Sequence, residues 1–168
     1  MTYLSKTVFI VAALALSACT DAGRFGGSGG AGGTGGFVGS NVASNPSSPA
    51  YFQQTVGDRV LFAVDQSTLS EEAQLILNAQ AEWLGTNGDF TAIIEGHADE
   101  QGTREYNLAL GARRANAVHE YLLSRGVAGH RMRIVSFGKE RPIEICSNES
   151  CYSRNRRAVT VIAAGAGV

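Results

Sequence analysis

The sequence predicts an α+β fold, a two-layer sandwich with helices packed on one mixed four-stranded sheet. Two stretches, 70–84 and 104–124, carry apolar residues at the spacing of an amphipathic helix. Shorter stretches with the apolar runs or the polar–apolar alternation of strands lie at 59–64, 90–96, 131–137 and 157–162. Strands and helices that alternate in this order pack as layers around one hydrophobic core.

The first strand and the first helix have clear local signals. The segment 59–64 is a short apolar run. Ser70 is a residue type that caps helix N-termini, and Glu71 and Glu72 stand where their negative charge favours the helix dipole. The glycine-containing segment 85–89 ends the helix. We assign to the core its apolar positions Leu69, Ala73, Ile76, Leu77, Trp83 and Leu84.

The second helix is the longest predicted element. It runs from Arg104 to Ser124, and Gly126 ends it. Its predicted buried stripe consists of Leu108, Gly111, Ala115, Val118 and Leu122. Within that stripe Gly111 costs about 1 kcal/mol of helix propensity relative to alanine.

Residues 1–18 have the composition of an export signal. Lys6 supplies a positive charge, and the nine apolar residues from Val8 to Leu16 are too few to cross a membrane. The run ends in the sequence LSAC at Cys19, which resembles the lipobox of bacterial lipoproteins. This resemblance implies cleavage before Cys19 and acylation of its thiol and its new amino group. Ordinary cleavage that leaves Cys19 free is the alternative.

Residues 19–50 are predicted to be a flexible tether. Glycine occupies 10 of the 17 positions from Gly23 to Gly39, and a segment rich in proline and serine follows at 45–49. Such a composition cannot offset the backbone entropy lost on folding. A glycine-rich phosphate loop is disfavoured because no strand precedes it, no helix follows and no Gly-Lys-Ser/Thr closes it. The folded domain is therefore assigned to 51–168.

The net charge of the chain is close to zero, with 14 Lys and Arg residues against 15 Asp and Glu residues. Removing the leader, which holds Lys6 and no acidic residue, changes the formal net charge from −1 to −2. Because a near-neutral chain has no basic field, we expect no nucleic-acid partner. We assign the local run of Arg154, Arg156 and Arg157 to the solvated surface.

The three cysteines fit one lipid site and one disulfide. An odd number leaves one cysteine over in an exported protein. If Cys19 carries lipid, Cys146 and Cys151 remain as a pair in an oxidising compartment, where disulfides persist. A zinc half-site is the alternative for this pair, but no second pair of ligands stands near it. We expect neither a metal nor a cofactor.

Polar residues after the second predicted strand form a candidate site. Asp99 lies in the glycine-containing loop 95–102, and loops at strand ends are common ligand sites. On the helix that follows, Asn107 and Arg114 are seven positions apart and share a stripe at the rim of the buried face. Asp99 and Arg114 can therefore flank one shallow pocket. By geometry alone, an internal ion pair and a ligand site fit this pattern equally well.

The segment 95–118 resembles the core of the OmpA-like peptidoglycan-binding domain, in particular its subgroup of peptidoglycan-associated lipoproteins (Pal). Two later segments, 138–142 and 155–159, match the family as well. The resemblance covers about Val60 to Ile162 and implies a domain that binds the cell wall without catalysis. The family spacing N-x2-L-x3-R-A-x2-V, which is specific at this length, is supplied here by Asn107, Leu110, Arg114, Ala115 and Val118.

Carried over by position, the resemblance makes Asp99 and Arg114 the ligands of diaminopimelate. The free end of that amino acid is a zwitterion, whose ammonium suits a carboxylate and whose carboxylate suits a guanidinium. Asn107 either fixes the loop or contacts the ligand. The other expected contacts are hydrogen bonds from Ala98 and Thr103 and apolar walls from Phe62 and Leu108.

The resemblance also implies a cellular setting. Lipid on Cys19 would anchor the protein in the outer membrane with its domain facing the periplasm, and Thr20 after the lipid site favours that location. The expected partners are the diaminopimelate-containing stem peptide of peptidoglycan, TolB and, further, TolA. Together they would form the Tol–Pal system of envelope integrity and cell division.

Enzymes are the first competing class. His97 and Asp99 with a later histidine, His119 or His130, have the residue types of a two-histidine, one-carboxylate iron site. That site usually sits on an all-β barrel, whereas long helices intervene here. A wall hydrolase could use the carboxylates of 95–100, but Arg114 should keep Asp99 ionised, which suits binding better than proton donation. The sequence therefore predicts a protein that is not an enzyme.

A flagellar motor stator of the MotB type, which shares the domain, is the second competing class. It would need a membrane-spanning helix that bears a proton-carrying acid. The leader is short, holds no acidic residue and ends in the lipobox-like sequence. We therefore favour the lipoprotein.

Overall fold

The structure, a computed structural model, describes residues 45–165 of the chain. A π-helical turn at Phe52–Gly57 and a 3-10 turn at Gly129–Arg131 accompany its regular elements. The predicted leader, the lipid site Cys19 and the tether as far as residue 44 lie outside the described residues. In chain order the regular elements are α1 (Pro49–Tyr51), β1 (Arg59–Leu61), α2 (Glu71–Thr86), β2 (Phe90–His97), α3 (Arg104–Ser124), β3 (Met132–Gly138), α4 (Glu149–Asn155) and β4 (Arg157–Ala164).

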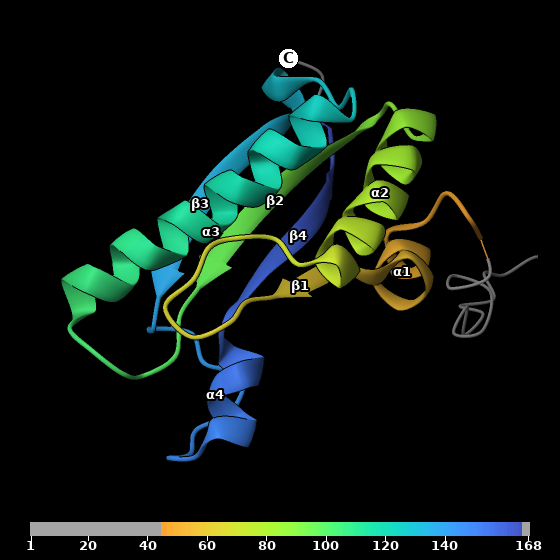
Figure 1. The fold of residues 1–168 in the computed structure, drawn as a ribbon. Coiled ribbons are helices and arrows are strands. Elements are labelled where there is room, and N and C mark those ends of the chain that lie inside the picture. Colours follow the sequence, from red (N-terminus) through yellow and green to blue (C-terminus); the bar gives the residue numbers. More distant parts are fainter. Residues whose placement is uncertain (1–44, 166–168) are drawn as a thin grey trace, which may run out of the picture. The chain divides into compact units, whose positions relative to one another are not determined.

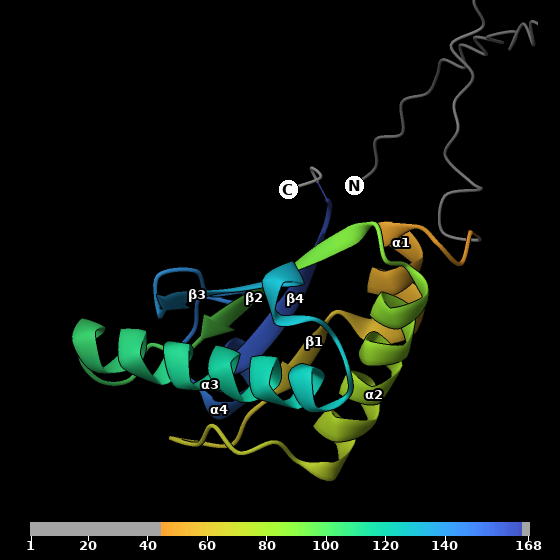
Figure 2. The ribbon, with the colours of Figure 1, turned by 90° about the horizontal axis from the view of Figure 1, so that it is seen from above.

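The strands form one mixed sheet in the order β1-β4-β2-β3. β2 and β3 are parallel, whereas β4 runs antiparallel to both β1 and β2. The helices α2 and α3 lie on the same face of this sheet, with α3 along β2 and β3 (Figure 1, Figure 2). The predicted two-layer α+β fold is therefore confirmed.

The core lies between that sheet face and the two long helices. Ala92 and Ile94 of β2 alternate with less buried neighbours, as expected for a strand with one covered face. From the helices, Leu77, Leu84 and Leu122 are fully buried against them. Each such leucine contributes roughly 1.5 to 3 kcal/mol through the apolar surface that it removes from water.

The two ends of α2 are stabilised differently, the first by a neighbouring residue and the second by a residue distant in sequence. Ser70 caps the N-terminus as predicted, because its hydroxyl accepts a hydrogen bond from the Ala73 N–H at 3.1 Å. At the other end Arg131 donates to the carbonyls of Leu84, Asn87 and Phe90 at 2.7–3.0 Å. The side chain of Arg131 is thus used to bind the carbonyls at the end of α2. β3 begins at Met132, one residue later than predicted.

The folded part begins ahead of Tyr51, the predicted first residue of the domain. The indole N–H of Trp83 donates to the carbonyl of Pro46 at 2.7 Å. Ser48 caps α1, with its hydroxyl accepting from the Tyr51 N–H at 3.1 Å. The composition of this segment alone does not reveal the contact with Trp83, because that residue on α2 is 37 residues away from Pro46.

Two segments differ from the expected strands and loops. β1 ends at Leu61 and not at Val64, because the chain leaves the sheet there to pass beside α3 (Figure 1). The predicted loop before β4 contains a short helix, α4, which Asn148 caps through its side chain. The first of these departures brings the backbone carbonyls of Ala63 and Gln66 to Arg114 of α3.

The buried face of α3 differs from the predicted stripe in its first half. Leu108 is 44% exposed, whereas Asn107, Leu110 and Arg114 are buried. The reason is that this half of the helix lies over the loops after β1 and β2, whose backbone carbonyls accept hydrogen bonds from Asn107 and Arg114. Polar side chains therefore take positions that an apolar pattern would assign to solvent.

Candidate functional site

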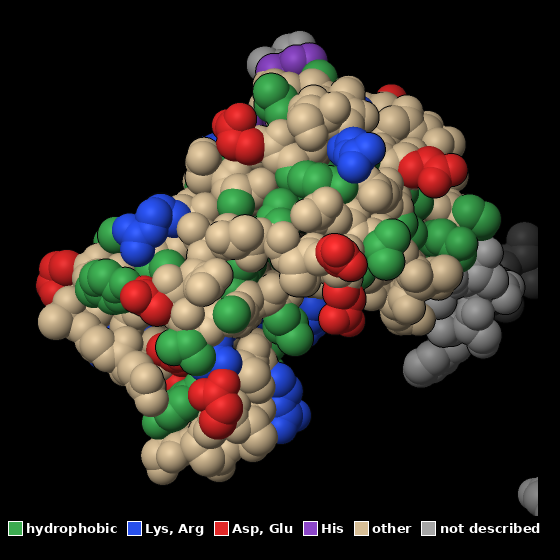
Figure 3. Space-filling model, in the orientation of Figure 1, with side chains coloured by type: hydrophobic (Ala, Val, Ile, Leu, Met, Phe, Trp, Pro, Cys, Tyr) green, Lys and Arg blue, Asp and Glu red, His purple; other side chains and the backbone are tan. Residues whose placement is uncertain are grey.

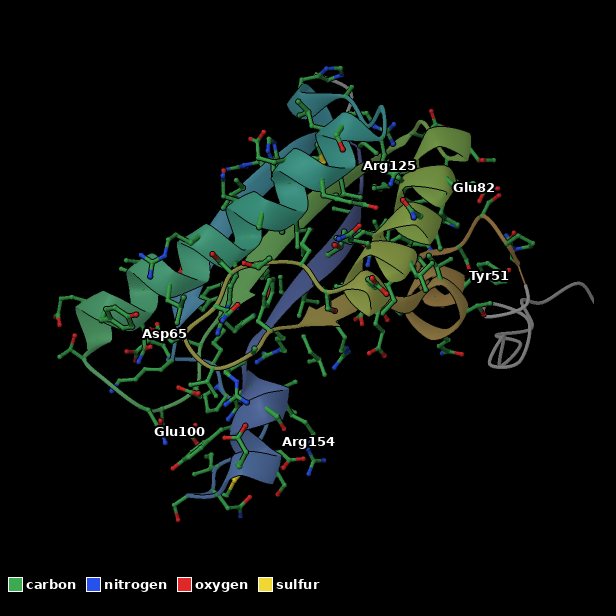
Figure 4. The ribbon with its side chains drawn as sticks, viewed as in Figure 1. Tyr51, Asp65, Glu82, Glu100, Arg125 and Arg154 are labelled. Carbon is green, nitrogen blue, oxygen red and sulfur yellow. A yellow bond between two sulfur atoms is a disulfide. The ribbon has the colours of Figure 1, made fainter. Side chains whose placement is uncertain are left out.

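A shallow cavity of about 250 Å³ lies where the loops after β1 and β2 meet the first turns of α3. Figure 4 labels one acidic residue of each loop, Asp65 and Glu100, at this end of α3. On the face that carries the helices, acidic and basic side chains are dispersed and form no large patch of one charge (Figure 3). The charge of the cavity therefore comes from its own residues. The cavity is lined by Val64, Asp65, Asp99, Gln101, Gly102, Tyr106, Asn107 and Leu110.

A larger cavity of about 390 Å³ lies between β1, the start of α2 and the segment before β4. Its wall is mostly apolar, with Leu61, Ile76 and Ile143 among its residues. Its two arginines already have acidic partners, because Arg59 pairs with Asp58 and Arg154 with Glu144. The predicted ligand residues Asp99 and Asn107 line the smaller cavity and not this one, so the smaller cavity is the candidate site.

Asp99 is the central acid of the smaller cavity and is 8% exposed. Its Oδ1 accepts a hydrogen bond from the Gln101 N–H at 3.3 Å. Its Oδ2 pairs with Nη1 of Arg156 at 3.1 Å. The predicted acid is therefore at the predicted loop, but its arginine partner is a different one from the predicted Arg114.

Arg114 is fully buried and does not line the cavity, whereas the helical geometry predicted a position at the rim of the buried face of α3. Its side chain is fully buried and donates to three carbonyl oxygens: Gln66 at 2.8 Å, His97 at 2.8 Å and Ala63 at 3.2 Å. The guanidinium carbon lies 5.3 Å from the ring centre of Phe62. Burial lowers the pKa of Arg114 to about 10, although the nearby Asp99 carboxylate acts in the opposite direction.

Asp65 and Tyr106 are cavity residues that the sequence analysis missed. The Tyr106 hydroxyl donates to the Asp65 carboxylate, and this hydrogen bond raises the pKa of the phenol. Asp65 has a φ of 56°, which is uncommon for a residue other than glycine. The signal that could have found Asp65 is its place in a polar turn, directly after an apolar strand.

The remaining predicted ligand residues lie around the cavity in different roles. Asn107 lines it and also fixes the loop, since its amide donates to the Gln101 carbonyl at 2.7 Å. Thr103 caps α3 by accepting from the Tyr106 N–H at 3.2 Å. Ala98 is buried, and its N–H donates to the Gly138 carbonyl at 2.8 Å. Neither Thr103 nor Ala98 lines the cavity.

The two predicted apolar wall residues do not line this cavity. Leu108 is largely exposed and does not line the cavity, whereas Leu110 does. Phe62 belongs to the hydrophobic core and lies under the Arg114 guanidinium. Leu108 and Leu110 are two positions apart, which is about 200° around the helix, so they lie on different faces of α3.

Arg156 and Arg157 are buried, which corrects their assignment to the solvated surface. They are 4% and 6% exposed, and only Arg154 of the run is open to solvent. Arg157 donates to the carbonyls of Asn155 and Arg141 at 3.2 and 3.1 Å, and burial lowers its pKa to about 10. A cluster of basic residues in the sequence therefore marks internal hydrogen bonding here.

Cys146 and Cys151 form the predicted disulfide, with their Cα atoms 6.1 Å apart. Within residues 45–165, Glu144 and these two cysteines are the one group of three potential metal ligands that lie close together. Because the two sulfurs are bonded to each other, the structure favours the disulfide over the zinc alternative for this pair. The histidines of the iron alternative form no such group in this part of the chain.

His97 is a packing residue. It is 1% exposed and its ring stacks on Phe137, with centroids 5.5 Å apart. Burial, together with the positive charges of Arg157 and Arg141, lowers its pKa to about 4. A neutral, enclosed imidazole is poorly placed to accept a proton from a substrate.

Comparison with known proteins identifies the family of this chain. The model of the OmpA family matches residues 61–156. The chain belongs to the OmpA family. A peptidoglycan-associated lipoprotein of Agrobacterium fabrum is 45% identical over 156 residues, which cover 93% of this chain and 85% of that protein. One of Rhizobium meliloti is 54% identical over 125 residues, which cover 74% and 70% of the two chains. The predicted subgroup, the peptidoglycan-associated lipoproteins, is thereby confirmed.

Solved structures agree with this assignment. The peptidoglycan-associated lipoprotein of Burkholderia pseudomallei is 36% identical, with a TM-score of 0.64 over 72% of this chain and 98% of that one. The C-terminal domain of Helicobacter pylori MotB has a TM-score of 0.60 over 65% of this chain and 86% of that one, but it is only 19% identical and shows the fold alone.

Membership of this non-catalytic family confirms that the protein is not an enzyme. Among residues 45–165, no helix is both long and apolar enough to cross a bilayer. The family model matches residues 61–156, which lie entirely within the described part of the chain.

Proposed function

We propose that the protein binds diaminopimelate-containing peptidoglycan through the cavity at Asp99, non-covalently and without catalysis. The observation that carries this proposal is the arrangement of charges there. The Asp99 carboxylate stands in the cavity wall, and the Arg114 guanidinium lies behind it. The names of the relatives, peptidoglycan-associated lipoproteins, support peptidoglycan as the larger ligand.

The ligand is chemically matched to this pair. The ammonium of the diaminopimelate zwitterion would pair with Asp99, as an ionic hydrogen bond in a partly desolvated site. Asp65, on the opposite loop, supplies a second acceptor to the same cavity. The Asn107 side chain holds the Gln101 carbonyl, so that the loop around Asp99 keeps its form when the ligand enters.

Arg114 would receive the ligand carboxylate by exchange. Two of its three carbonyl partners, Ala63 and Gln66, belong to the loop after β1, whereas His97 belongs to β2. A carboxylate is a stronger acceptor for a guanidinium than a carbonyl is. A shift of the loop would therefore open Arg114 to the ligand while its hydrogen bond to β2 is retained.

The wider setting of the protein is part of the same proposal. Lipid on Cys19 would hold it in the outer membrane, and the tether would let the periplasmic domain reach the wall. TolB, and through it TolA, would be its protein partners in the Tol–Pal system. Replacement of Cys19 by serine should then move the protein from the membrane fraction to the soluble fraction.

Binding can be tested with peptides that differ only in the third residue, diaminopimelate or lysine. Lysine keeps the ammonium and lacks the carboxylate. We expect Asp99→Ala to weaken binding of both peptides by about tenfold or more, as loss of a charged partner does. Arg114→Lys should reduce the preference for diaminopimelate, because an ammonium cannot grip a carboxylate bidentately.

The controls are the exposed neighbours Glu105→Ala and Arg113→Lys, which should bind as the wild type does. Circular dichroism must show that each variant is folded, because Arg114 holds three carbonyls. Equal affinity of wild type and Asp99→Ala for the diaminopimelate peptide would overturn the proposed site. Release of muropeptides from purified wall would contradict a purely binding role.

TolB is expected to use the face around Asp99 and Arg114 as well, so that wall and TolB compete. Titration of TolB in the presence of saturating diaminopimelate peptide measures this directly. An unchanged affinity for TolB would place its binding surface elsewhere on the protein.

A further inference from the structure

The acidic ligand residue Asp99 is held by an arginine from the far end of the chain. Oδ2 of Asp99 lies 3.1 Å from Nη1 of Arg156, which is 57 residues away in sequence. Both residues are buried, with 8% and 4% exposure. We infer that Arg156 is a positioning residue for wall binding, which fixes the Asp99 carboxylate in the direction of the ligand ammonium. This inference rests on the proposed function of the cavity.

Arg156 is itself fixed by two further segments. Its Nε donates to the Phe62 carbonyl at 3.2 Å, at the point where the chain leaves β1. Its Nη1 and Nη2 both donate to the carboxylate of Glu149, in the first turn of α4. A planar guanidinium whose nitrogen atoms are held in three directions cannot turn without breaking several charged hydrogen bonds. Arg156 therefore presents a rigid partner to Asp99.

Arg114 does not hold the Asp99 carboxylate in place. Among the described residues, its hydrogen bonds go to three backbone carbonyls and to no carboxylate. Asp99 has one further restraint, the Gln101 N–H on Oδ1, at a long 3.3 Å. The orientation of the carboxylate thus depends mainly on Arg156. Holding a ligand group in its binding geometry before the ligand arrives reduces the entropy lost on binding.

The two arginines have different roles at the site, because they lie on different elements. Arg114 stands on α3 and would take the ligand carboxylate, whereas Arg156 stands between α4 and β4 and serves the residue that takes the ammonium. Loss of Arg156 should therefore weaken the diaminopimelate and lysine peptides by the same factor, because both carry the ammonium. Loss of the Arg114 guanidinium should change the preference between them.

The experiment uses the full-length protein in detergent micelles, with calorimetric titration of the two peptides. We expect Arg156→Gln to weaken both by about tenfold, the effect of an ordinary coupling between contacting charged residues. Arg156→Lys should restore part of the affinity, because its ammonium can still reach one acceptor. The matched control is Arg157→Gln, which removes an equally buried arginine whose hydrogen bonds go to Asn155 and Arg141.

A double-mutant cycle with Asp99→Asn separates positioning from a general structural effect. If Arg156 acts through Asp99, Arg156→Gln should weaken binding much less in the Asp99→Asn background than in the wild type. Losses that simply multiply, or an equal loss in Arg157→Gln, would overturn the inference. If Asp99→Asn loses binding and Arg156→Gln keeps it, the inference fails while the proposed site stands. If neither substitution changes binding, the proposed site itself fails.

Discussion

Gly111 of α3 lies against Gly96 of β2 so closely that neither position has room for a side chain. A Cβ on Gly96 would overlap the Gly111 carbonyl, and one on Gly111 would lie 2.5 Å from the Ser136 hydroxyl and 2.8 Å from the Gly96 oxygen. The helix can reach the sheet at this point because both residues lack a side chain. Gly111 therefore disfavours the helix by its propensity but allows α3 to pack closely against β2.

Gly96→Ala is expected to lower the free energy of unfolding by about 3 kcal/mol, since the added methyl group must displace backbone in a packed core. Urea unfolding followed by circular dichroism measures the change. Gly85→Ala is the matched control, because no atom lies within 4 Å of a Cβ built there and the residue is exposed on α2. That control should stabilise the protein by up to about 1 kcal/mol through helix propensity. Similar unfolding midpoints for both variants would contradict the close-packing account.

The free energy of unfolding should depend on pH through His97. Burial lowers the pKa of its folded form to about 4, whereas an unfolded histidine titrates near 6.5. The unfolded state therefore binds the proton more readily, so this contribution is complete above about pH 6.5 and is lost as the pH falls toward 4. We expect a loss on the order of 2 kcal/mol across this window.

His97→Gln removes the titrating group, so the variant should show a flatter dependence of unfolding free energy on pH between 4 and 6.5. The exposed His130→Gln is the control and should keep the wild-type slope. Parallel curves for wild type and His97→Gln would mean that another group causes the acid destabilisation.

Gln80 is fully buried in α2 and connects the helix to two other elements. Its amide donates to the Gly57 carbonyl at 2.6 Å, and its Oε1 accepts from the Thr160 hydroxyl of β4 at 2.8 Å. Thr160→Val should cost about 1 to 3 kcal/mol, because it leaves a buried amide oxygen without its donor. Thermal unfolding gives the change, with Thr91→Val as control, whose hydroxyl makes a longer bond of 3.4 Å. An equal cost in the two variants would refute a special role for the buried pair.

The segment before Tyr51 should contribute to stability. A chain that begins at Tyr51 lacks the Pro46 carbonyl that Trp83 uses and the Ser48 cap of α1. We expect its free energy of unfolding to be about 1 to 3 kcal/mol lower than that of a chain that begins at Asn45, because the cap and the hydrogen bond are lost. Chemical denaturation of the two chains, followed by Trp83 fluorescence, decides the point. Identical stabilities would return the boundary to Tyr51.

The sequence alone determines the order and type of the main elements because these depend on neighbouring residues. Ser70 caps α2 and Arg104–Ser124 forms α3 as the local pattern indicates. The family motif also places Asp99 and Arg114 near one another, and in the structure the two side chains are close enough for their charges to interact. What local pattern cannot give is whether a charged residue is buried.

Tertiary structure decided the partners of the buried polar groups. Arg156, assigned to the surface from its basic neighbours, is enclosed by Asp99 and by the Phe62 carbonyl, which is 94 residues distant. Arg114 lies inside because the loop after β1 brings it two carbonyls from about 50 residues away, at separations of 48 and 51. A buried guanidinium is stable only where acceptors are supplied for its N–H groups. Periodicity along the chain records which face of an element is apolar, whereas those acceptors come from segments that meet only when the chain has folded.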